Sequence, residues 1–194
     1  MLTSRQKAIL IGMLLGDGCL ETNGTKVRLR IDHSGSQKDY VLWKFKELEG
    51  FTASKPRFSE VYDKRTKRLY QHWRFDTLSL RSLKVYQNLF YSHKRKIVPK
   101  QITKLLKSPL TLAVWFMDDG YNRNDCRGMY FNTQAYTLEE QGLLQSCLKN
   151  KFNINSKVHW ARGKPKIYIP SKEGNKLCKL INPYVIPNMR HKLL

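Results

Sequence analysis

One apolar motif occurs twice in this chain, and its repetition limits the folds that the chain can adopt. Residues 10–18 read Leu-Ile-Gly-Met-Leu-Leu-Gly-Asp-Gly, and residues 112–120 read Leu-Ala-Val-Trp-Phe-Met-Asp-Asp-Gly. Each copy is apolar on nearly every helical face and closes on an Asp-Gly pair, which predicts a buried helix followed by a turn. The two aspartates, Asp17 and Asp119, stand 102 residues apart. Each copy therefore opens one half of the chain.

The segments that follow each copy have the same order in both halves. In the first half, Asn23-Gly24 is a hairpin signal, and residues 27–32 alternate like a strand with one buried face. The other elements expected there are a helix capped by Ser36 and stopped near Gly50, strands at 57–62 and 70–75 around a turn at 63–68, and a helix at 80–91. Those expected in the second half are a turn near Asn124 and Asp125, a strand at 128–133, a helix at 137–152, strands at 157–160 and 166–169 around a turn at 161–165, and a helix at 171–181.

Helix-start signals place the boundary between the two halves. Ser108 followed by Pro109 is typical of an N-cap and a first helical residue, so the second motif helix is expected to begin there. Thr137 and Glu140 form a capping box in the second half. We predict an N-terminal repeat at 1–98, a linker at 99–108 and a C-terminal repeat at 109–194. The predicted fold class is α+β, with two pseudo-symmetric αββαββα repeats.

Small residues on the first motif helix predict how the two repeats meet. Gly12 and Gly16 are four residues apart and share one helix face, where a second helix can approach closely. The second motif helix carries the bulkier Val114 and Trp115, so the packing is expected to be asymmetric. We expect this central helix pair to join the repeats and to bring the two motif aspartates to a common edge.

The charge of the chain is its strongest compositional signal. It has 36 Lys and Arg residues against 15 Asp and Glu residues, a formal net charge of +21. Self-repulsion on this scale destabilises a compact fold, so a polyanionic partner is its simplest explanation, and nucleic acid fits best. A membrane surface is the rival, but the longest apolar stretch, 8–15, is too short to span a bilayer. Both halves are basic, at +14 for residues 1–107 and +7 for residues 108–194, so the partner is expected to touch both.

The cysteines and the N-terminus indicate the compartment. The four cysteines, Cys19, Cys126, Cys147 and Cys178, are scattered and form no metal-binding pair, which favours free thiols in a reducing environment. The N-terminus reads as a helix rather than as a cleavable signal. We therefore expect an intracellular protein.

Several motifs together resemble one known family. The two helices of the LxGxxxGDG type, each opening an αββαββα unit in a small basic chain, resemble the LAGLIDADG homing endonucleases. The segments 115–120, 131–134, 186–189 and 192–193 are similar to the monomeric two-motif branch of the intron-encoded type. The resemblance covers essentially the whole chain. It implies antiparallel sheets forming a DNA-binding saddle, and a monomer that cuts both strands of a long asymmetric target to leave staggered ends in intron homing. It also implies an organelle, either mitochondrion or chloroplast, or the bacterial cytoplasm as the compartment.

The paired motif aspartates indicate a metal site. Two carboxylates a few ångströms apart repel each other unless cations are present, and Mg²⁺ binds one or two carboxylates while keeping several waters. Asp17 and Asp119 are therefore candidate catalytic ligands of Mg²⁺, with Mn²⁺ as a substitute. Gly16 and Asp118 occupy matching positions and could add backbone carbonyls. One Asp-Gly pair alone is explained equally well as a helix-ending turn, but two repeat-related copies in so basic a chain favour function.

Further catalytic candidates follow from the resemblance. It implies that Lys96 and Lys192, which end similar basic runs, reach the active sites and stabilise charge developing on the phosphate. A solvated basic surface is an equal alternative for both lysines. Gln134 resembles the family's residue that positions metal-bound water. Its counterpart in the first half is Asp32 or His33, which departs from the pattern, and a satisfied polar strand end is the favoured interpretation of His33.

Basic residues on the predicted strands and turns indicate the surface for DNA readout. Arg28 and Arg30 share one face by the two-residue period of a strand, and a twisted sheet from each half could lie along a major groove. The loops 64–68 and 162–166 are expected to contact phosphates. Tyr70, Trp73 and Trp160 are favoured as core or cross-strand residues over stacking platforms. The candidate DNA-binding residues are Arg28, Arg30, Arg57, Lys64, Arg65, Lys67, Arg68, Arg74, Lys157, Arg162, Lys164 and Lys166.

Other functions compete with DNA cleavage. An RNA maturase, which resembles the same family, would bind intron RNA and assist splicing, but the intact acidic pair favours the nuclease. A transcriptional regulator on the same fold finds no support, because no separate helix-turn-helix segment is evident. A nucleotide-binding enzyme is excluded because residues 16–18 form neither a Gly-x-Gly-x-x-Gly pattern nor a phosphate-binding loop.

Overall fold

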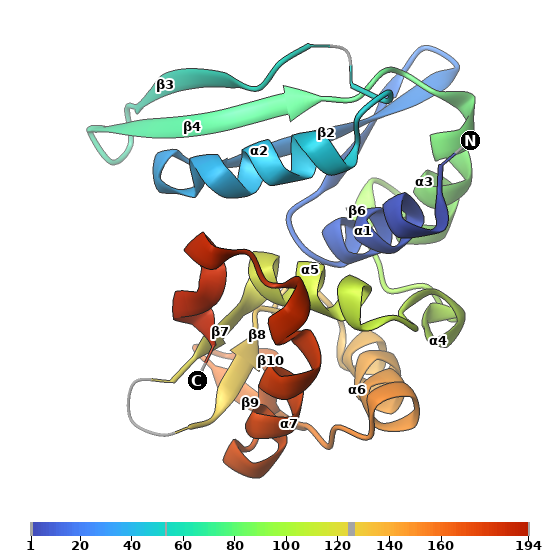
Figure 1. The fold of residues 1–194 in the computed structure, drawn as a ribbon, viewed down its shortest axis with the longest axis vertical. Helices are drawn as coiled ribbons and strands as arrows, with labels where there is room; N and C mark the ends of the chain where they lie inside the picture. Colours follow the sequence, from blue (N-terminus) through green and yellow to red (C-terminus); the bar gives the residue numbers. More distant parts are fainter. Residues whose placement is uncertain (1, 53, 124–126, 194) are drawn as a thin grey trace. The chain divides into compact units, whose positions relative to one another are not determined.

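The computed structural model describes residues 2–52, 54–123 and 127–193. Packing divides the chain into two compact units (Figure 1). The first unit, called the motif unit below, contains the residues up to Gly16 and those from Asn88 onward; the second, called the inserted unit, contains Asp17–Gln87. No described helix has both the length and the apolar character that a membrane span requires.

The two motif helices form the centre of the motif unit. Helix α1 (Ser4–Leu15) begins with a capping box between Thr3 and Gln6, and α5 (Pro109–Asp119) begins with Ser108 accepting a hydrogen bond from the Thr111 N–H. All residues from Ile9 to Leu15 in α1 and from Leu110 to Met117 in α5 are buried. The predicted starts, including Pro109 in the first helical turn, and the burial on all sides are confirmed.

The helices α1 and α5 pack through residues that match in the repeat. A Cβ atom added to Gly12 would lie 2.6 Å from Cβ of Val114 and 2.7 Å from the Thr111 carbonyl oxygen. A Cβ atom added to Gly16 would lie 2.4 Å from Cβ of Asp118. The predicted close approach at both glycines is therefore confirmed. Val114 provides the expected asymmetry, whereas Trp115 stacks on Phe131 of its own repeat at 4.0 Å between ring centroids.

An antiparallel sheet in the order β7-β8-β10-β9 completes most of the motif unit. Its strands are β7 (Gly120–Asn122), β8 (Met129–Phe131), β9 (Lys157–Ala161) and β10 (Lys164–Ile169). Helix α6 (Leu138–Phe152) packs on β10, and α7 (Ser171–Ile181) packs on α5. The Thr137–Glu140 capping box and the bounds of α7 are as predicted.

Two predicted features of this sheet differ in detail. The strand expected at 128–133 is shorter, because after Phe131 the chain turns away to form the loop before α6. The turn expected at 161–165 contains only Arg162 and Gly163 between the paired residues, and both have a positive φ, of 51° and 72°. Those angles suit a two-residue hairpin turn, so the flanking strands extend farther. The turn predicted near Asn124 and Asp125 lies outside the described residues.

Short elements lie around the boundary between the units at Gln87 and in the rest of the motif unit. A small hairpin, β5 (Tyr91–Ser92) with β6 (Arg95–Lys96), follows α3 (Lys84–Phe90), and α4 (Ile102–Leu105) lies in the predicted linker. The helix predicted at 80–91 is therefore a 3₁₀ turn, η2 (Arg81–Leu83), followed by α3, and Tyr91 begins a strand. Two 3₁₀ segments, η3 (Asn182–Tyr184) and η4 (Pro187–Lys192), end the described chain.

The inserted unit is a second four-stranded antiparallel sheet, in the order β1-β2-β4-β3, with α2 packed on β2 and β4 (Figure 1). Its elements are β1 (Cys19–Asn23), β2 (Lys26–Ser34), η1 (Gly35–Gln37), α2 (Lys38–Glu47), β3 (Arg57–Asp63) and β4 (Arg68–Asp76). Buried and exposed residues alternate along β2 as predicted, and Gly24 has φ +60° in the expected hairpin turn. Ser36 does not cap α2, because it lies inside η1 and α2 begins without a side-chain cap.

The observed element order supports the repeat. The chain runs α1-β1-β2-α2-β3-β4-α3 and then α5-β7-β8-α6-β9-β10-α7, which is the predicted αββαββα order twice. Compactness divides the chain differently from the repeat, since α1 packs against α5 and groups with the second half. The boundaries 1–98, 99–108 and 109–194 therefore remain a prediction about the repeat. No disulfide links Cys19, Cys147 and Cys178, while Cys126 lies outside the described residues.

Candidate metal centre and nucleic-acid interface

The C-terminal end of α1 is held by two side chains from elsewhere in the motif unit. The Tyr136 hydroxyl donates to the Leu15 carbonyl at 2.9 Å, and the Lys96 ammonium donates to the Gly16 carbonyl at 2.6 Å. The last carbonyls of a helix lack partners within it and carry partial negative charge, so a cation is favourable there. Lys96, predicted to reach the active site, thus contacts the residue that directly precedes the motif aspartate Asp17.

The C-terminal end of α5 is held in a corresponding way. The Lys192 ammonium donates to the Met117 carbonyl at 2.6 Å and to the Asp118 carbonyl at 3.2 Å. Gly16 and Asp118 are equivalent in the repeat, so each motif helix presents the same terminal carbonyl to a lysine of its own half. The alternative, that both lysines are only solvated surface charges, does not agree with these contacts. Their catalytic role remains a prediction.

Acidic groups gather at these helix ends. The Asp118 carboxylate lies against the backbone of Gly16, where a Cβ atom would come within 2.6 Å of its Oδ2. The pKa of the nearby Tyr136 hydroxyl is raised, first by burial and then by the negative charges of Asp119 and Glu140. Carboxylate and carbonyl oxygens are the ligands that Mg²⁺ prefers. The donor set that the motif unit provides at the ends of α1 and α5 therefore fits a hard divalent cation.

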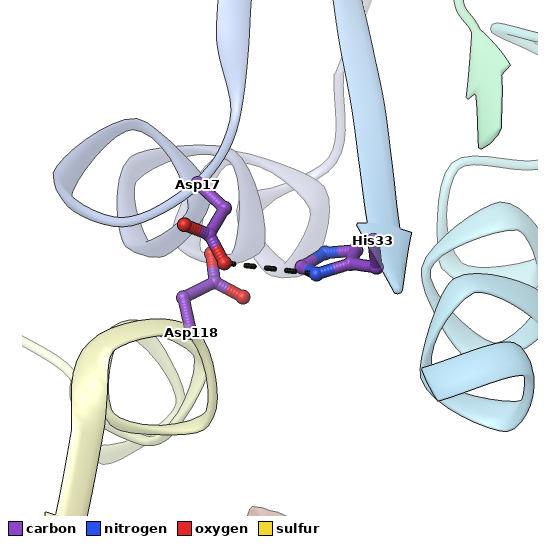
Figure 2. Close-up of side chains that lie close together, drawn as sticks. All are labelled: Asp17, His33 and Asp118. Atoms are coloured by element: carbon purple, nitrogen blue, oxygen red, sulfur yellow. Dashed lines mark ion pairs between the residues drawn. The ribbon is translucent and has the colours of Figure 1, made fainter. Parts of the chain in front are cut away.

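Asp17 is the first residue of the inserted unit and faces a histidine there. Oδ2 of Asp17 lies 3.6 Å from Nδ1 of His33, and Figure 2 shows the carboxylate and the ring edge facing each other. Nε2 of His33 lies 2.8 Å from the ammonium nitrogen of Lys44, a side chain with no exposed surface. His33 at the end of β2 is therefore a buried, hydrogen-bonded residue, as its favoured interpretation predicted. Lys44 was not predicted.

Gln134 lies in the turn between β8 and α6, three residues beyond the end of β8. Its amide donates a long hydrogen bond, 3.5 Å, to Oδ1 of Asn132. The turn itself is rigidly attached, because the buried Gln141 amide donates to the carbonyls of Thr133 at 3.1 Å and Pro165 at 2.9 Å. Gln134 thus has a fixed backbone and a half-exposed side chain, while its predicted role with water is untested.

The outer face of the inserted unit's sheet carries arginines paired with acids. Arg28 and Arg30 share one face as predicted, and Glu21 binds them at 2.9 Å and 2.7 Å. Asp76 binds Arg30 at 3.1 Å and approaches Arg57 at 3.7 Å. These carboxylates fix the direction of the guanidinium groups. Sequence reasoning identified the arginines but not the acids, although Glu21 and Asp76 are the cross-strand partners of Arg28 and Arg30.

The other predicted basic residues of the inserted unit lie on its second hairpin. Arg74 is in β4, and its Nε is buried without a hydrogen-bond partner among the described residues. The turn of this hairpin is shaped by Asp63, whose carboxylate accepts the Arg65 backbone N–H at 2.8 Å. The exposed basic residues at this turn are Lys64, Arg65, Lys67 and Arg68. Their exposure agrees with the predicted phosphate contacts.

The outer face of the motif unit's sheet is more aromatic than predicted. Tyr121, Tyr130 and Tyr168 form a ladder, with ring centroids 5.4 Å and 5.1 Å apart. Lys166 joins this ladder: its ammonium lies 3.8 Å from the Tyr130 ring and donates to the Tyr121 hydroxyl at 2.6 Å. His159 stacks on Tyr168 at 4.1 Å. The other predicted basic residues, Lys157, Arg162 and Lys164, are exposed.

Several residues of the candidate site could not be identified from sequence. Tyr136 and Gln141 act through contacts with residues far along the chain, and nothing local distinguishes them. Lys44 sits in an ordinary helical pattern with Val41 and Leu48, so its position on the buried face of α2 was the available signal. The tyrosine ladder could have been recognised because Tyr121, Tyr130 and Tyr168 lie directly opposite one another on paired strands.

Comparison with known proteins identifies relatives of this chain. Residues 7–177 match the LAGLIDADG DNA endonuclease family. The chain is 28% identical over 198 residues to the probable intron-encoded endonuclease 1 of Wickerhamomyces canadensis, covering 100% of the chain and 85% of that protein. It is also 28% identical over 191 residues to the cytochrome b mRNA maturase bI2 of Debaryomyces hansenii, covering 95% of the chain and 72% of that protein.

A solved structure resembles the whole chain. The homing endonuclease I-WcaI bound to its DNA recognition sequence matches with a TM-score of 0.93 and 27% sequence identity. The match covers 100% of this chain and 88% of that one. The paired motif helices and the two antiparallel sheets thus occur together in a solved homing endonuclease.

Proposed function

We propose, because this chain belongs to the LAGLIDADG DNA endonuclease family, that it is a Mg²⁺-dependent enzyme that cuts both strands of one long, asymmetric DNA site. The cut leaves staggered ends and serves intron homing. The observation that carries this proposal is the pair of motif helices whose equivalent terminal carbonyls, Gly16 and Asp118, are each held by a lysine. Chance surface charges would not produce the same arrangement twice.

The metal would be held by oxygen atoms at the ends of the two motif helices. Asp119 ends α5, and Asp17 is bonded to Gly16, so its Cα can be only about 3.8 Å from the Cα of Gly16. Their carboxylates, with the carbonyls of Gly16 and Asp118, are the proposed ligands. When bound, Mg²⁺ would stabilise negative charge on the attacking and leaving oxygens. Mn²⁺, which accepts the same oxygen ligands, should substitute.

Lysine and glutamine side chains would complete the two cleavage centres. The ammonium groups of Lys96 and Lys192 lie at the helix ends, where they can stabilise charge developing on a phosphate oxygen. The half-exposed Gln134 amide, with its long hydrogen bond to Asn132, is available to orient a water. The first half has no glutamine at the matching strand end, which makes the two centres chemically unequal.

DNA would bind along the outer faces of the two sheets. Phosphate contacts from the exposed hairpin turns provide affinity, and side chains on the strands provide sequence readout. Arg28 and Arg30, held in place by Glu21, are suited to bidentate contacts with guanine. In the motif unit, the aromatic ladder with Lys166 offers apolar contacts together with charge. The two sheet faces are therefore expected to read different base sequences.

The chain is proposed to act as a monomer. The helix pair that would otherwise form a dimer interface is built within one chain from α1 and α5. Gly12 on α1 accommodates Val114 on α5, and Gly16 accommodates Asp118. Two copies of either helix would place two glycines or two larger side chains opposite each other, which would lose the fit.

Cleavage of DNA from the joined exons of the surrounding gene tests this proposal. With Mg²⁺, the protein should cut a duplex that contains the intron insertion site, and a denaturing gel should show different cut positions on the two strands. Chelation of the metal should stop cleavage but not binding. Failure to cut any duplex that the protein binds tightly would contradict the proposal.

A second candidate function is RNA maturation, favoured by the likeness to the maturase of Debaryomyces hansenii. A maturase would bind folded intron RNA in preference to duplex DNA. Competition binding with the host intron RNA and the exon-junction duplex separates the two functions. Specific RNA binding without DNA cleavage would favour the maturase.

A further inference from the structure

One lysine side chain of the inserted unit, Lys44 on α2, is fully buried. Removing an ammonium group from water is unfavourable unless other groups compensate it. Its nitrogen lies 2.8 Å from Nε2 of His33 and 4.1 Å from the centre of the Tyr40 ring. Both contacts are favourable for an ammonium group. The negative charge nearest along this chain of contacts is Asp17, beyond His33.

The contact with Lys44 determines how the imidazole of His33 is used. When Lys44 is an ammonium group, which has only donors, Nε2 accepts its hydrogen bond. The ring hydrogen of a neutral imidazole is then on Nδ1, the atom that lies 3.6 Å from Oδ2 of Asp17 (Figure 2). The contacts therefore run in one direction: Lys44 donates to His33, and Nδ1 of His33 faces the Asp17 carboxylate.

The second repeat has a buried polar pair after the end of its own strand β8, and this pair is uncharged. There Thr133, just after β8, accepts and donates hydrogen bonds within a group that includes Gln141 of α6. Both side chains are fully buried, and Gln141 also binds the carbonyls of Tyr136 and Pro165. This neutral pair attaches the strand end to the following helix. A strand end can therefore be attached to the following helix without a buried lysine.

We propose that Lys44 is a positioning residue of the cleavage centre in the first half. It keeps the ring hydrogen of His33 on Nδ1, and His33 in turn orients the Asp17 carboxylate. The proposal rests on the proposed function, in which Asp17 binds the metal. A nitrogen that carries hydrogen has no lone pair for a metal, so His33 supports the site from behind and the ligands remain oxygens, which suits Mg²⁺.

The position of the ring hydrogen can be measured in the unmodified protein. Nitrogen-15 NMR of histidine-labelled full chain, without DNA or metal, distinguishes a ring nitrogen that bears hydrogen from one that does not. A His33→Gln sample assigns the His33 signals. We expect Nδ1 to carry hydrogen and Nε2 to lack it. Hydrogen on Nε2 would overturn the proposal, whether or not the protein cuts DNA.

A Lys44→Met substitution tests the consequence for cleavage, with Lys46→Met, at an exposed position of the same helix, as the matched control. Loss of an outer partner of a metal ligand typically costs about 10- to 100-fold in activity. Lys44→Met should slow the nicking of one DNA strand by that factor and leave the nicking rate of the other strand unaltered. The affinity for DNA should not change, whereas the NMR signals of His33 should move. Lys44→Arg, which retains a donor, should restore part of the rate.

The results separate this proposal from the proposed function. Equal slowing of both strands, or wild-type rates on both strands, in a folded Lys44→Met protein would overturn the positioning role. If Lys44→Met does not fold, the NMR measurement on the wild type still decides. A wild-type protein that cuts no DNA would contradict the endonuclease function, whereas the hydrogen on Nδ1 would be unaffected.

Discussion

Gly12 of α1 lies directly against Val114 of α5, and the two residues occupy the same position in the two copies of the motif. The same holds for Gly16 and Asp118. Contacts between equivalent residues occur only where the helices cross at the approximate symmetry axis of the repeat. At both points one copy has glycine and the other a larger residue, so the fit requires two different helices in one chain.

Substitution of Gly12 by valine should disrupt this helix pair. The new side chain would meet Cβ of Val114 at 2.6 Å and the backbone carbonyl of Thr111 at 2.7 Å, so the helices must separate. Overpacking of a core costs typically about 1–3 kcal/mol of unfolding free energy, measured by urea denaturation. Gly142→Ala in α6, whose added Cβ meets nothing within 4 Å, should instead stabilise the protein.

An exchange of the two residues provides a stricter test of the same contact. The double substitution Gly12→Val with Val114→Gly restores one large and one small residue at the crossing point. It should recover part of the stability that Gly12→Val loses. Additive losses in the double-mutant cycle would show that the two residues do not interact.

Tyr136 should support stability through its buried hydroxyl, which donates to the Leu15 carbonyl at 2.9 Å. Tyr136→Phe leaves that carbonyl without this donor and should cost about 1–3 kcal/mol. The pKa of Tyr136 is raised by burial and by the charge of Asp119. Because the pKa is raised in the folded protein, the stabilisation by the Tyr136 hydroxyl is complete below the pKa of the unfolded chain, about 10. It is lost as the pH rises toward the pKa of the folded protein. Urea denaturation of both proteins across alkaline pH should show the difference diminish.

Glu140 should make stability sensitive to acid. Its carboxylate binds Arg95 at 2.8 Å and 2.9 Å and accepts the Thr137 N–H at 2.7 Å. Burial opposes ionisation, but these hydrogen bonds outweigh it, and the pKa of Glu140 is lowered. The stabilisation is then present above the unfolded pKa and lost as the pH falls through the folded one. The Glu140→Gln variant should therefore have a lower free energy of unfolding than the wild type at neutral pH, and this difference should disappear in acid. A difference that stays constant as the pH falls would contradict the prediction.

Glu21 should restrain the DNA affinity of the arginines that it binds. Glu21→Gln removes a negative charge beside Arg28 and Arg30, which it contacts at 2.9 Å and 2.7 Å. Affinity for unrelated duplexes should rise a few-fold, roughly, and the preference for the target should fall, because the guanidinium groups lose their fixed direction. Fluorescence anisotropy at several salt concentrations measures both effects. Glu49→Gln, at an exposed position, is the control.

Features set by neighbouring residues could be predicted from the sequence. The caps at Ser108 and Thr137, the hairpin turn at Gly24 and the burial of the motif helices depend on short-range patterns, and all are present. The break at Leu83 in the helix predicted at 80–91 depends on how the chain joins the sheet, through the pairing of Leu80 with Val27. Such pairing has no local signal.

The candidate site divides in the same way. The repeat shows the motif aspartates and a basic run twice, and the family resemblance selects Lys96 and Lys192 within those runs. Lys44 and Tyr136 occur once, and their importance comes from contacts with His33 and Leu15 across the fold. Lys166 was predicted as a DNA contact from its charge alone, whereas the structure engages it with Tyr121 and Tyr130.

The most direct test of the account is strand-specific cleavage by Asp17→Asn and Asp119→Asn with Mg²⁺, with DNA affinity measured on the same samples. Asparagine retains the shape of the side chain but removes the negative charge that a metal requires. We predict that each substitution abolishes double-strand cleavage while the dissociation constant for the target changes little. Wild-type cleavage by both variants would contradict the assignment of these two aspartates to the metal centre.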